Sequence, residues 1–195
     1  MAEKVDRRVR KTKAQLRAGL ARLMQKKSIK EITVKELVDE VDINRSTFYL
    51  HYSDIYQMLE SIENEIAQAI EEYPLNLVQY GSSYPLIEHI FTILDNNKDI
   101  CIALMGSNGD MGFVSRMEKM IAETVLRQLS GKFAADNRDV EYVYAFCLNG
   151  CVGMIKAWLS SENQESTKHM AELTHRMIEN TTHDFLRKMP GDLTK

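Results

Sequence analysis

The sequence predicts an all-α protein. Only three Pro and nine Gly occur among its 195 residues, while residues that favour helices dominate the composition. Hydrophobic residues make up 44% of the chain, which is enough for a buried core at this length. They recur at the 3.6-residue spacing of amphipathic helices. These observations favour packed helices over strands that are joined by frequent turns.

The first two helices are predicted by periodicity and by a cap. Apolar residues share one helix face from about Arg7 to Lys27, and Arg and Lys fill the other face. A short polar connection, residues 28–31, follows. Thr33 and Glu36 then fit a capping box, so a second helix should begin there. The core face of this helix consists of Leu37, Val38 and Val41.

A tight turn should separate the second helix from a third. This turn should consist of residues 42–44, because Asp42 and Asn44 are of the types that tolerate a left-handed backbone. Ile43 should fill the core beneath it. Asn44 can cap a helix of about two turns, residues 45–51, in which Phe48 points inward. A helix this short depends on packing against its neighbours, as a recognition helix on a three-helix scaffold does. Its outward side chains are Arg45, Ser46, Thr47, Tyr49 and His51.

A long fourth helix follows, capped by Ser53 or Asp54 and ended by Pro74. Further helices are expected at about residues 86–96, 98–105, 112–130, 137–160 and 167–188, after a loop at 74–85. The acidic side chains of the fourth helix are expected on its solvated face and not as a general acid–base pair; they are Glu63, Glu65, Glu71 and Glu72. The chain should thus divide into a three-helix domain with a helix-turn-helix, residues 1–53, and a larger helical domain, residues 54–195.

Charge is distributed unevenly along the chain. Residues 1–30 hold eleven Lys or Arg and two acidic residues, a net charge of +9. Residues 51–195 hold twelve basic and twenty-one acidic residues, a net charge of −9. A polyanion would therefore attract the N-terminal end of the chain and repel the rest. A solvated helix face is the alternative for the basic run alone, but its position beside a helix-turn-helix favours DNA.

The helix-turn-helix also resembles a known family. Ile-Thr-Val-Lys-Glu-Leu at residues 32–37 and Ile-Asn-Arg-Ser-Thr-Phe-Tyr-Leu-His-Tyr at 43–52 resemble the N-terminal domain of the tetracycline-repressor-like (TetR/AcrR) transcriptional regulators. Residues 150–159, which end in Gly-Met-Ile-Lys-Ala-Trp-Leu, look like the subgroup that includes regulators of dihydroxyacetone-kinase operons. The resemblance implies a bacterial homodimer with a palindromic double-stranded DNA operator and a regulatory pocket in the larger domain. It would be associated with the nucleoid when bound to DNA.

Carried onto this sequence, the resemblance implies DNA contacts at the cap of the second helix and along the third. A helix N-terminus binds phosphate, Arg can be bidentate to guanine, and Tyr or His at the backbone positions the helix. The chain departs from the family at Ile55, where a Lys often touches phosphate, and at Val41-Asp42, where Ala-Gly is usual. Phosphate binding should therefore depend more on the first helix. The expected contacts are Thr33, Arg45, Ser46, Thr47, Tyr49 and His51, with Arg7, Arg8, Lys11 and Lys13 from the first helix.

The larger domain is expected to hold an effector pocket and a dimer interface. The chain's eleven Met suit a flexible apolar pocket for an unknown small-molecule effector, although ordinary core packing accounts for most of them. The helix at 137–160 is apolar around more than half of its circumference, so it could form a four-helix interface with the last helix and their symmetry mates. The pocket residues would be Phe91, Met105, Met117, Met120, Tyr144, Met154 and Trp158, and the interface residues Cys147, Gly150, Cys151, Met170, Leu173, Met177 and Phe185.

Metal sites, cofactors and membranes find little support in the sequence. Cys147 and Cys151 share a helix face, but a structural zinc site needs four ligands, and close packing explains them more simply. The three His of the last helix, residues 169, 175 and 183, do not lie at adjacent turns of one face. No apolar run approaches the ~20 residues that span a bilayer, and the N-terminal residues lack the apolar core of a signal peptide. We therefore expect a cytoplasmic protein with reduced thiols, no metal, no cofactor and no membrane partner.

The expected function is that of a DNA-binding transcriptional regulator, most simply a repressor, that a small ligand releases or engages. The alternative is a protein–protein adaptor or co-activator, derived from the same family, with weak or no specific DNA binding. An enzyme is disfavoured, because no nucleophile–base set, nucleotide loop or metal cluster occurs in the sequence.

Overall fold

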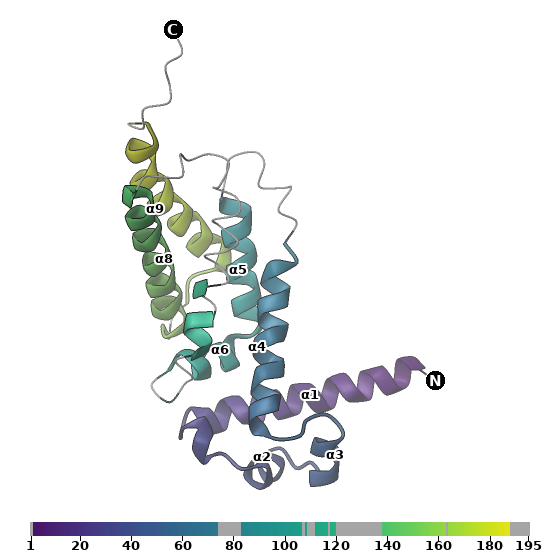
Figure 1. Cartoon of the computed structure of the whole chain (residues 1–195). Coiled ribbons are helices and arrows are strands. Elements are labelled where there is room, and N and C mark those ends of the chain that lie inside the picture. Colours follow the sequence, from purple (N-terminus) through teal and green to yellow (C-terminus); the bar gives the residue numbers. More distant parts are fainter. Residues whose placement is uncertain are drawn as a thin grey trace. The chain divides into compact units, whose positions relative to one another are not determined.

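The computed structural model describes residues 2–73, 83–106, 108, 112–116, 118–119, 138–162 and 164–187; the side chains of 2–6, 138, 140 and 183–187 are not described. All regular structure in these ranges is helical, which confirms the predicted all-α fold. Most of the helix predicted at 112–130 lies outside them. The helices are α1 (Ala2–Met24), α2 (Val34–Glu40), α3 (Arg45–Tyr49), α4 (Ile55–Glu71), α5 (Tyr84–Asn96), α6 (Lys98–Met105), α8 (Arg138–Leu159) and α9 (Thr167–Arg187), with a 3-10 turn at Ile29–Glu31 (Figure 1).

The chain forms two compact units. Unit 1 consists of Met1–Ala69 and Asn97–Met117, and unit 2 of Ile70–Asn96 and Glu118–Lys195. The chain therefore enters unit 2, returns to unit 1 and enters unit 2 again. The domain boundary expected after residue 53 stays a prediction.

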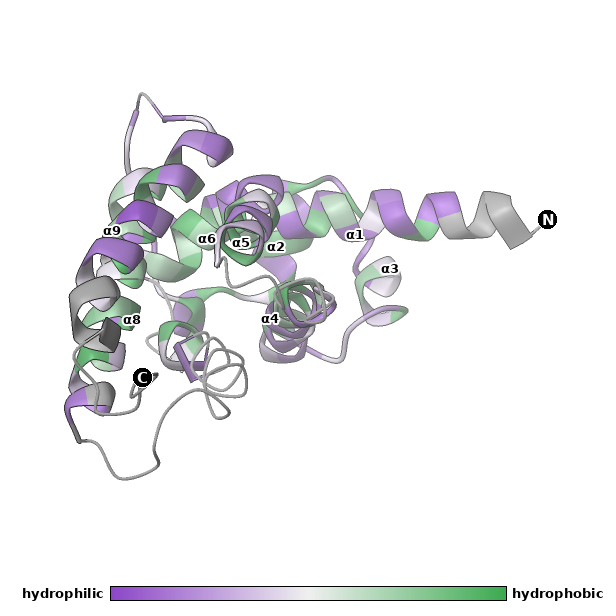
Figure 2. Cartoon of the chain, turned by 90° about the horizontal axis from the view of Figure 1, so that it is seen from above, coloured by the Kyte–Doolittle hydropathy of each residue, from purple (hydrophilic) through white to green (hydrophobic). Residues whose placement is uncertain are grey.

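Helix α1 is the central helix of unit 1. It packs against α6 and α2, and α2 packs against α3; α6 lies on one side of α1, and α2 and α3 on the other (Figure 1). The coloured part of α1 that precedes its buried segment is mostly hydrophilic (Figure 2). From Leu16 onward its apolar side chains enter the core, and Leu16, Leu20 and Met24 are fully buried. Burial of each such side chain stabilises the fold by about 1.5–3 kcal/mol.

Gly19 allows α1 and α2 to approach each other closely. A Cβ atom on Gly19 would lie 2.3 Å from Val41 Cγ1 and 3.2 Å from Leu37 Cδ1. At the edge of the same contact, Arg22 Nε donates a hydrogen bond of 2.7 Å to Glu40 Oε1. The missing side chain of Gly19 therefore leaves room for Val41.

One side chain of α4 is not where the sequence analysis placed it. The helix begins after Asp54, whose Oδ1 accepts a hydrogen bond of 2.8 Å from Gln57 N, and ends at Glu71, before Pro74. Glu63 was expected on the solvated face, but only 5% of it is exposed, and Arg116 Nη2 donates a hydrogen bond to its Oε2. That prediction is wrong, because helical periodicity cannot reveal a basic partner 53 residues away.

Unit 2 is built around α9, which packs along α5 and α8. Phe91 of α5 and Trp158 of α8 meet edge to face in its core, with 5.2 Å between ring centroids. His175 of α9 lies at the start of α5, and its Nδ1 is 3.0 Å from Ser83 Oγ. Its Nε2 lies 3.4 Å from Glu179 Oε1. The contact between His175 and Ser83 joins segments that are 92 residues apart.

Helix α8 is apolar on two sides, and among the described residues one side is buried while the other is exposed. Val152, Ile155 and Trp158 are buried, whereas Tyr142 and Phe146 are 70% and 67% exposed. By length and composition alone, the 19 residues of Glu141–Leu159 could cross a membrane. The prediction that no apolar run approaches the length of a membrane span is therefore wrong. One such helix is a weak indication, since core helices of non-membrane proteins meet the same criterion.

Candidate DNA-binding interface

The turn and cap before α3 form as the sequence predicts. Asp42 has a φ of 52°, the left-handed conformation that Asp tolerates better than most residues. Asn44 Oδ1 accepts hydrogen bonds from Ser46 N at 2.8 Å and from Ser46 Oγ at 2.7 Å. These bonds satisfy amide and hydroxyl groups at the start of α3. The helix ends at Tyr49, two residues earlier than predicted.

Phe48 holds this short helix on its scaffold. Its side chain is fully buried, and its ring centroid lies 5.7 Å from that of the buried Tyr52. The predicted inward orientation of Phe48 is confirmed. Ile43, expected to fill the core beneath the turn, is only half-buried. Five residues cannot form a stable helix alone, so the position of α3 depends on Phe48 and on the Asn44 cap.

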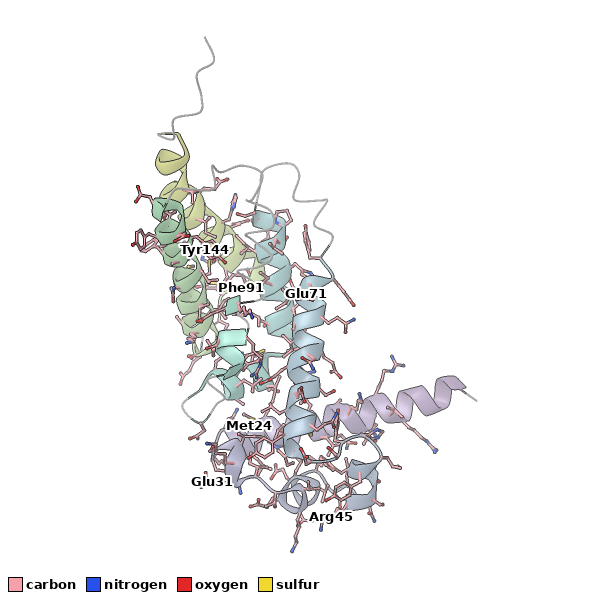
Figure 3. All side chains as sticks on the ribbon, in the orientation of Figure 1. Met24, Glu31, Arg45, Glu71, Phe91 and Tyr144 are labelled. Carbon is pink, nitrogen blue, oxygen red and sulfur yellow. The ribbon has the colours of Figure 1, made fainter. Side chains whose placement is uncertain are left out.

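The side chains around Phe48 differ in how far they reach solvent. Arg45 and Ser46 are exposed, and Tyr49 is 47% exposed; Arg45 lies on the outer side of unit 1 (Figure 3). Thr47 and His51, also expected as DNA contacts, are half-buried. The exposed surface of α3 is therefore formed mainly by Arg45, Ser46 and Tyr49.

Arg45 and Tyr49 contact each other across one helical turn. Arg45 Nη2 and Nε donate hydrogen bonds to Tyr49 Oη, at 3.0 Å and 3.3 Å. The guanidinium carbon lies 5.5 Å from the centroid of the Tyr49 ring, within the range of a cation–π interaction. The spacing i, i+4 is visible in the sequence and predicts such a pair, but the sequence analysis assigned the two residues separate roles.

Thr33 is occupied by its own helix. Its hydroxyl donates to Glu36 Oε2 at 2.9 Å and accepts from Glu36 N at 3.2 Å, and its backbone N donates to Glu36 Oε2 at 2.9 Å. The capping box is thus confirmed. Hydrogen bonds from Lys27, and then from Thr33, lower the pKa of Glu36 to about 2. A DNA phosphate would compete with this carboxylate for Thr33, whose predicted DNA contact remains a prediction.

The four basic residues expected to bind phosphate have different surroundings. Arg7, Arg8 and Lys11 are exposed. Lys13 is half-buried, and its Nζ lies 3.7 Å from Glu65 Oε1 and 5.7 Å from the centroid of the Tyr52 ring. Glu65 also lies 3.6 Å from Arg17 Nη1. Lys13 therefore helps join α1 to α4, which leaves the first three residues as the more accessible charges.

The residues of the expected effector pocket are only partly brought together. Phe91, Tyr144, Met154 and Trp158 belong to unit 2, whereas Met105 belongs to unit 1; Met117 and Met120 lie outside the described residues. Trp158 Nε1 donates a hydrogen bond of 2.8 Å to Glu165 O, so its ring is fixed. Tyr144 Oη is buried and has no hydrogen-bond partner in the part of the chain that is described. Burial raises the pKa of Tyr144 to about 12.

The residues of the expected dimer interface also fall into two groups. Gly150 and Met177 are exposed, while Cys147, Cys151 and Leu173 are half-buried. Met170 is buried inside unit 2 and has little surface left for a partner. The side chain of Phe185 lies outside the described residues. Tyr142 and Phe146 were not predicted as interface residues, although their i, i+4 spacing on an apolar helix is visible in the sequence.

The thiols show no sign of activation. Burial raises the pKa of Cys101 to about 12 and that of Cys151 to about 11. Burial also raises the pKa of Cys147. Thiolate nucleophiles and metal ligands need the opposite shift. Within the described ranges, no group of three or more His, Cys, Asp or Glu is placed to hold a metal ion.

Comparisons with known proteins agree with this architecture. A TetR-type family model described as "Transcriptional regulator C-terminal region" matches residues 81–180, just over half of the chain. A TetR transcriptional regulator from Streptococcus agalactiae 2603V has a similar fold, with a TM-score of 0.60 and 20% identity over 91% of this chain and 99% of that one. The structure entitled "Dihydroxyacetone kinase operon activator DhaS" is also similar, with a TM-score of 0.56 and 16% identity over 89% and 95% of the two chains. A comparison with curated proteins finds no match. The chain belongs to the TetR family of transcriptional regulators.

Proposed function

We propose that this regulator binds a palindromic DNA operator as a homodimer, represses transcription, and is released by a small-molecule effector. The observation that carries the proposal is α3, whose Phe48 is buried while Arg45, Ser46 and Tyr49 face solvent. Arg can be bidentate to guanine in the major groove, and Tyr can contact the backbone. The exposed Arg7, Arg8 and Lys11 of α1 add positive charge for phosphate.

An exposed stripe along α8 supports the homodimer. Tyr142, Phe146, Gly150 and Gly153 lie on one face of the helix, at spacings of four, four and three residues. The aromatic side chains are exposed, and a Cβ on either Gly would meet no atom within 4 Å. In a two-fold interface the large residues of one copy can fill the space left by the Gly residues of the other.

The dimer is what gives the operator its symmetry. Two copies of α3 can enter successive major grooves when they are about 34–36 Å apart, so each half of a palindrome is read by one copy. A ligand that binds better at another separation weakens DNA binding by its difference in affinity for the two states. A hundredfold release requires about 2.7 kcal/mol of such preference.

The buried hydroxyl of Tyr144 supports a response to a small molecule. A buried polar group without a partner costs about 1–3 kcal/mol, and a ligand that supplies a hydrogen bond would recover part of this cost. Phe91 and Trp158 offer an aromatic core in the same unit. We further propose that the protein acts in the cytoplasm, without a cofactor and without enzymatic activity.

A second candidate is an adaptor or co-activator with weak DNA binding. One protein of similar fold is entitled an operon activator, and residues 150–159 look like the same subgroup. Ile55 is buried and cannot offer the phosphate contact that a Lys often provides there. The net charge of −9 over residues 51–195 also disfavours DNA near that part of the chain. Under this proposal a dihydroxyacetone-kinase operon would be the regulated target.

Fluorescence anisotropy separates the two candidates. The full chain is titrated against duplexes from its own upstream region and against a scrambled duplex, at several salt concentrations. Preferential binding, with log affinity falling by ~0.9 per neutralised phosphate per log unit of salt, would support an operator-reading regulator. Equal and weak binding to all duplexes would favour the adaptor. A palindromic footprint and a dimer in sedimentation experiments would support the symmetric mode.

A further inference from the structure

The contact between Arg45 and Tyr49 leaves the reading edge of Arg45 free. A guanidinium has five N–H donors, and two of them, on Nε and Nη2, point at Tyr49 Oη. The outer fork, formed by Nη1 and the second N–H of Nη2, is not used by this contact. That fork can donate to guanine O6 and N7 at the same time. Tyr49 therefore does not compete with a base for Arg45.

Tyr49 is itself held by the core. Its ring meets the buried Phe48 edge to face, with 5.5 Å between centroids. Phe48 in turn packs on Tyr52. A chain of ring contacts thus runs from the core of unit 1 to an exposed guanidinium. An exposed Arg ordinarily samples many rotamers, and fixing one of them before DNA arrives reduces the entropy lost on binding.

We propose that Tyr49 is a positioning residue that fixes the guanidinium of Arg45 for guanine recognition, and so determines base preference without touching a base. The proposal rests on the proposed operator binding through α3. It differs from the expectation drawn from the sequence, in which Tyr49 contacts only the DNA backbone and acts equally on all sequences. Loss of the Tyr49 hydroxyl should lower the preference for guanine by about two- to tenfold, the range expected for one immobilised side chain.

The test compares Tyr49→Phe with the unaltered full-length chain. Selection from a random-sequence duplex library first identifies the preferred base at each position. The same selection with Arg45→Ala shows at which operator position the base preference is lost. Anisotropy titrations then use pairs of duplexes that differ only at this position, with guanine in one and adenine in the other. Tyr49→Phe keeps the ring and its contact with Phe48 but removes the acceptor oxygen. The expected result is a smaller guanine-to-adenine affinity ratio, with no further change in that ratio when Tyr49→Phe is added to Arg45→Ala.

Tyr56→Phe is the matched control, because Tyr56 is 57% exposed but lies on α4, outside the recognition helix. It should leave the guanine-to-adenine ratio unchanged, and unfolding midpoints should agree among all variants. An equal loss of affinity for both duplexes in Tyr49→Phe would make Tyr49 a backbone contact alone and overturn the proposal. The proposal would also be overturned if Tyr49→Phe still changed the guanine-to-adenine affinity ratio in the Arg45→Ala background. No enrichment of any sequence by the unaltered chain would overturn the operator-binding function, and this proposal with it.

Discussion

Gly19 and Val41 should show strong energetic coupling. Gly in the middle of a helix is less favourable than Ala by about 1 kcal/mol, so Gly19→Ala would stabilise α1 if space were available. A Cβ there lies 2.3 Å from Val41 Cγ1, and this overlap requires a shift of a stiff β-branched side chain or of α2 itself. Overpacking of this kind costs about 1–3 kcal/mol. The net effect of Gly19→Ala should be a destabilisation of up to about 2 kcal/mol.

The sign should reverse when Val41 is shortened. Val41→Ala removes Cγ1, and the next nearest atom, Leu37 Cδ1 at 3.2 Å, is the end of a flexible side chain. Gly19→Ala in the Val41→Ala background should then gain most of the ~1 kcal/mol of helix propensity. The coupling energy of the double-mutant cycle should be about 1–3 kcal/mol, within the range measured for residues in contact.

Urea unfolding of the full chain, followed by far-UV circular dichroism, measures the four free energies of the cycle. Ala18→Gly, on the same helix, serves as the control for helix propensity alone, and it should cost about 1 kcal/mol with or without Val41→Ala. Equal destabilisation by Gly19→Ala in both backgrounds would show that Val41 is not the obstacle, and that the close approach of α1 and α2 has another cause.

Asp42→Asn keeps the tolerance for a positive φ and removes a negative charge. For a phosphate ~10 Å from this charge, the substitution should raise DNA affinity by about twofold at low salt. A rise in affinity that persists at high salt would contradict this explanation. The pKa of Glu36 is lowered to about 2, so the stability that Glu36 contributes is present above its ordinary pKa of 4.5 and is lost as the pH falls towards 2. Glu36→Gln should therefore weaken the fall in the free energy of unfolding between pH 4.5 and pH 2. An unchanged fall would assign it to other carboxylates. Phe146→Asp should raise the dimer dissociation constant more than tenfold in sedimentation, and an unchanged constant would place the interface elsewhere. Tyr144→Phe should raise the free energy of unfolding by up to ~1 kcal/mol, because it removes a buried hydroxyl that has no hydrogen-bond partner among the described residues. A loss of stability would show that the hydroxyl is hydrogen-bonded.

Short-range features of unit 1 were predictable because their causes are local. The capping box at Thr33 and Glu36, the positive φ of Asp42 and the inward orientation of Phe48 each depend on residues within a few positions of one another. The Arg45–Tyr49 contact is also local, and its i, i+4 spacing allowed a prediction that was not made. Propensity, capping and helical periodicity act over one or two turns, which is why they can be read from a sequence.

Contacts between distant segments were not predictable in the same way. Glu63 has the spacing of a solvated residue, but Arg116 binds it, and His175 meets Ser83 at the start of α5. Gly19 reads as an unfavourable residue in a helix until the position of Val41 is known. In each case the partner is chosen by the packing of whole helices. The sequence of one element contains no information about which distant side chain will face it.

The course of the chain brings a segment from the middle of the sequence into the unit that holds α3. Residues 97–117 return to unit 1 after the chain has entered unit 2, and α6 packs along α1. Ile100, Cys101 and Leu104 of α6 are buried in the unit that also holds α3. Because α3 has no stability of its own, its position depends on α1 and α2, and α1 depends in part on α6. We therefore expect a perturbation of α6 to act directly, through the core, on the unit that holds α3.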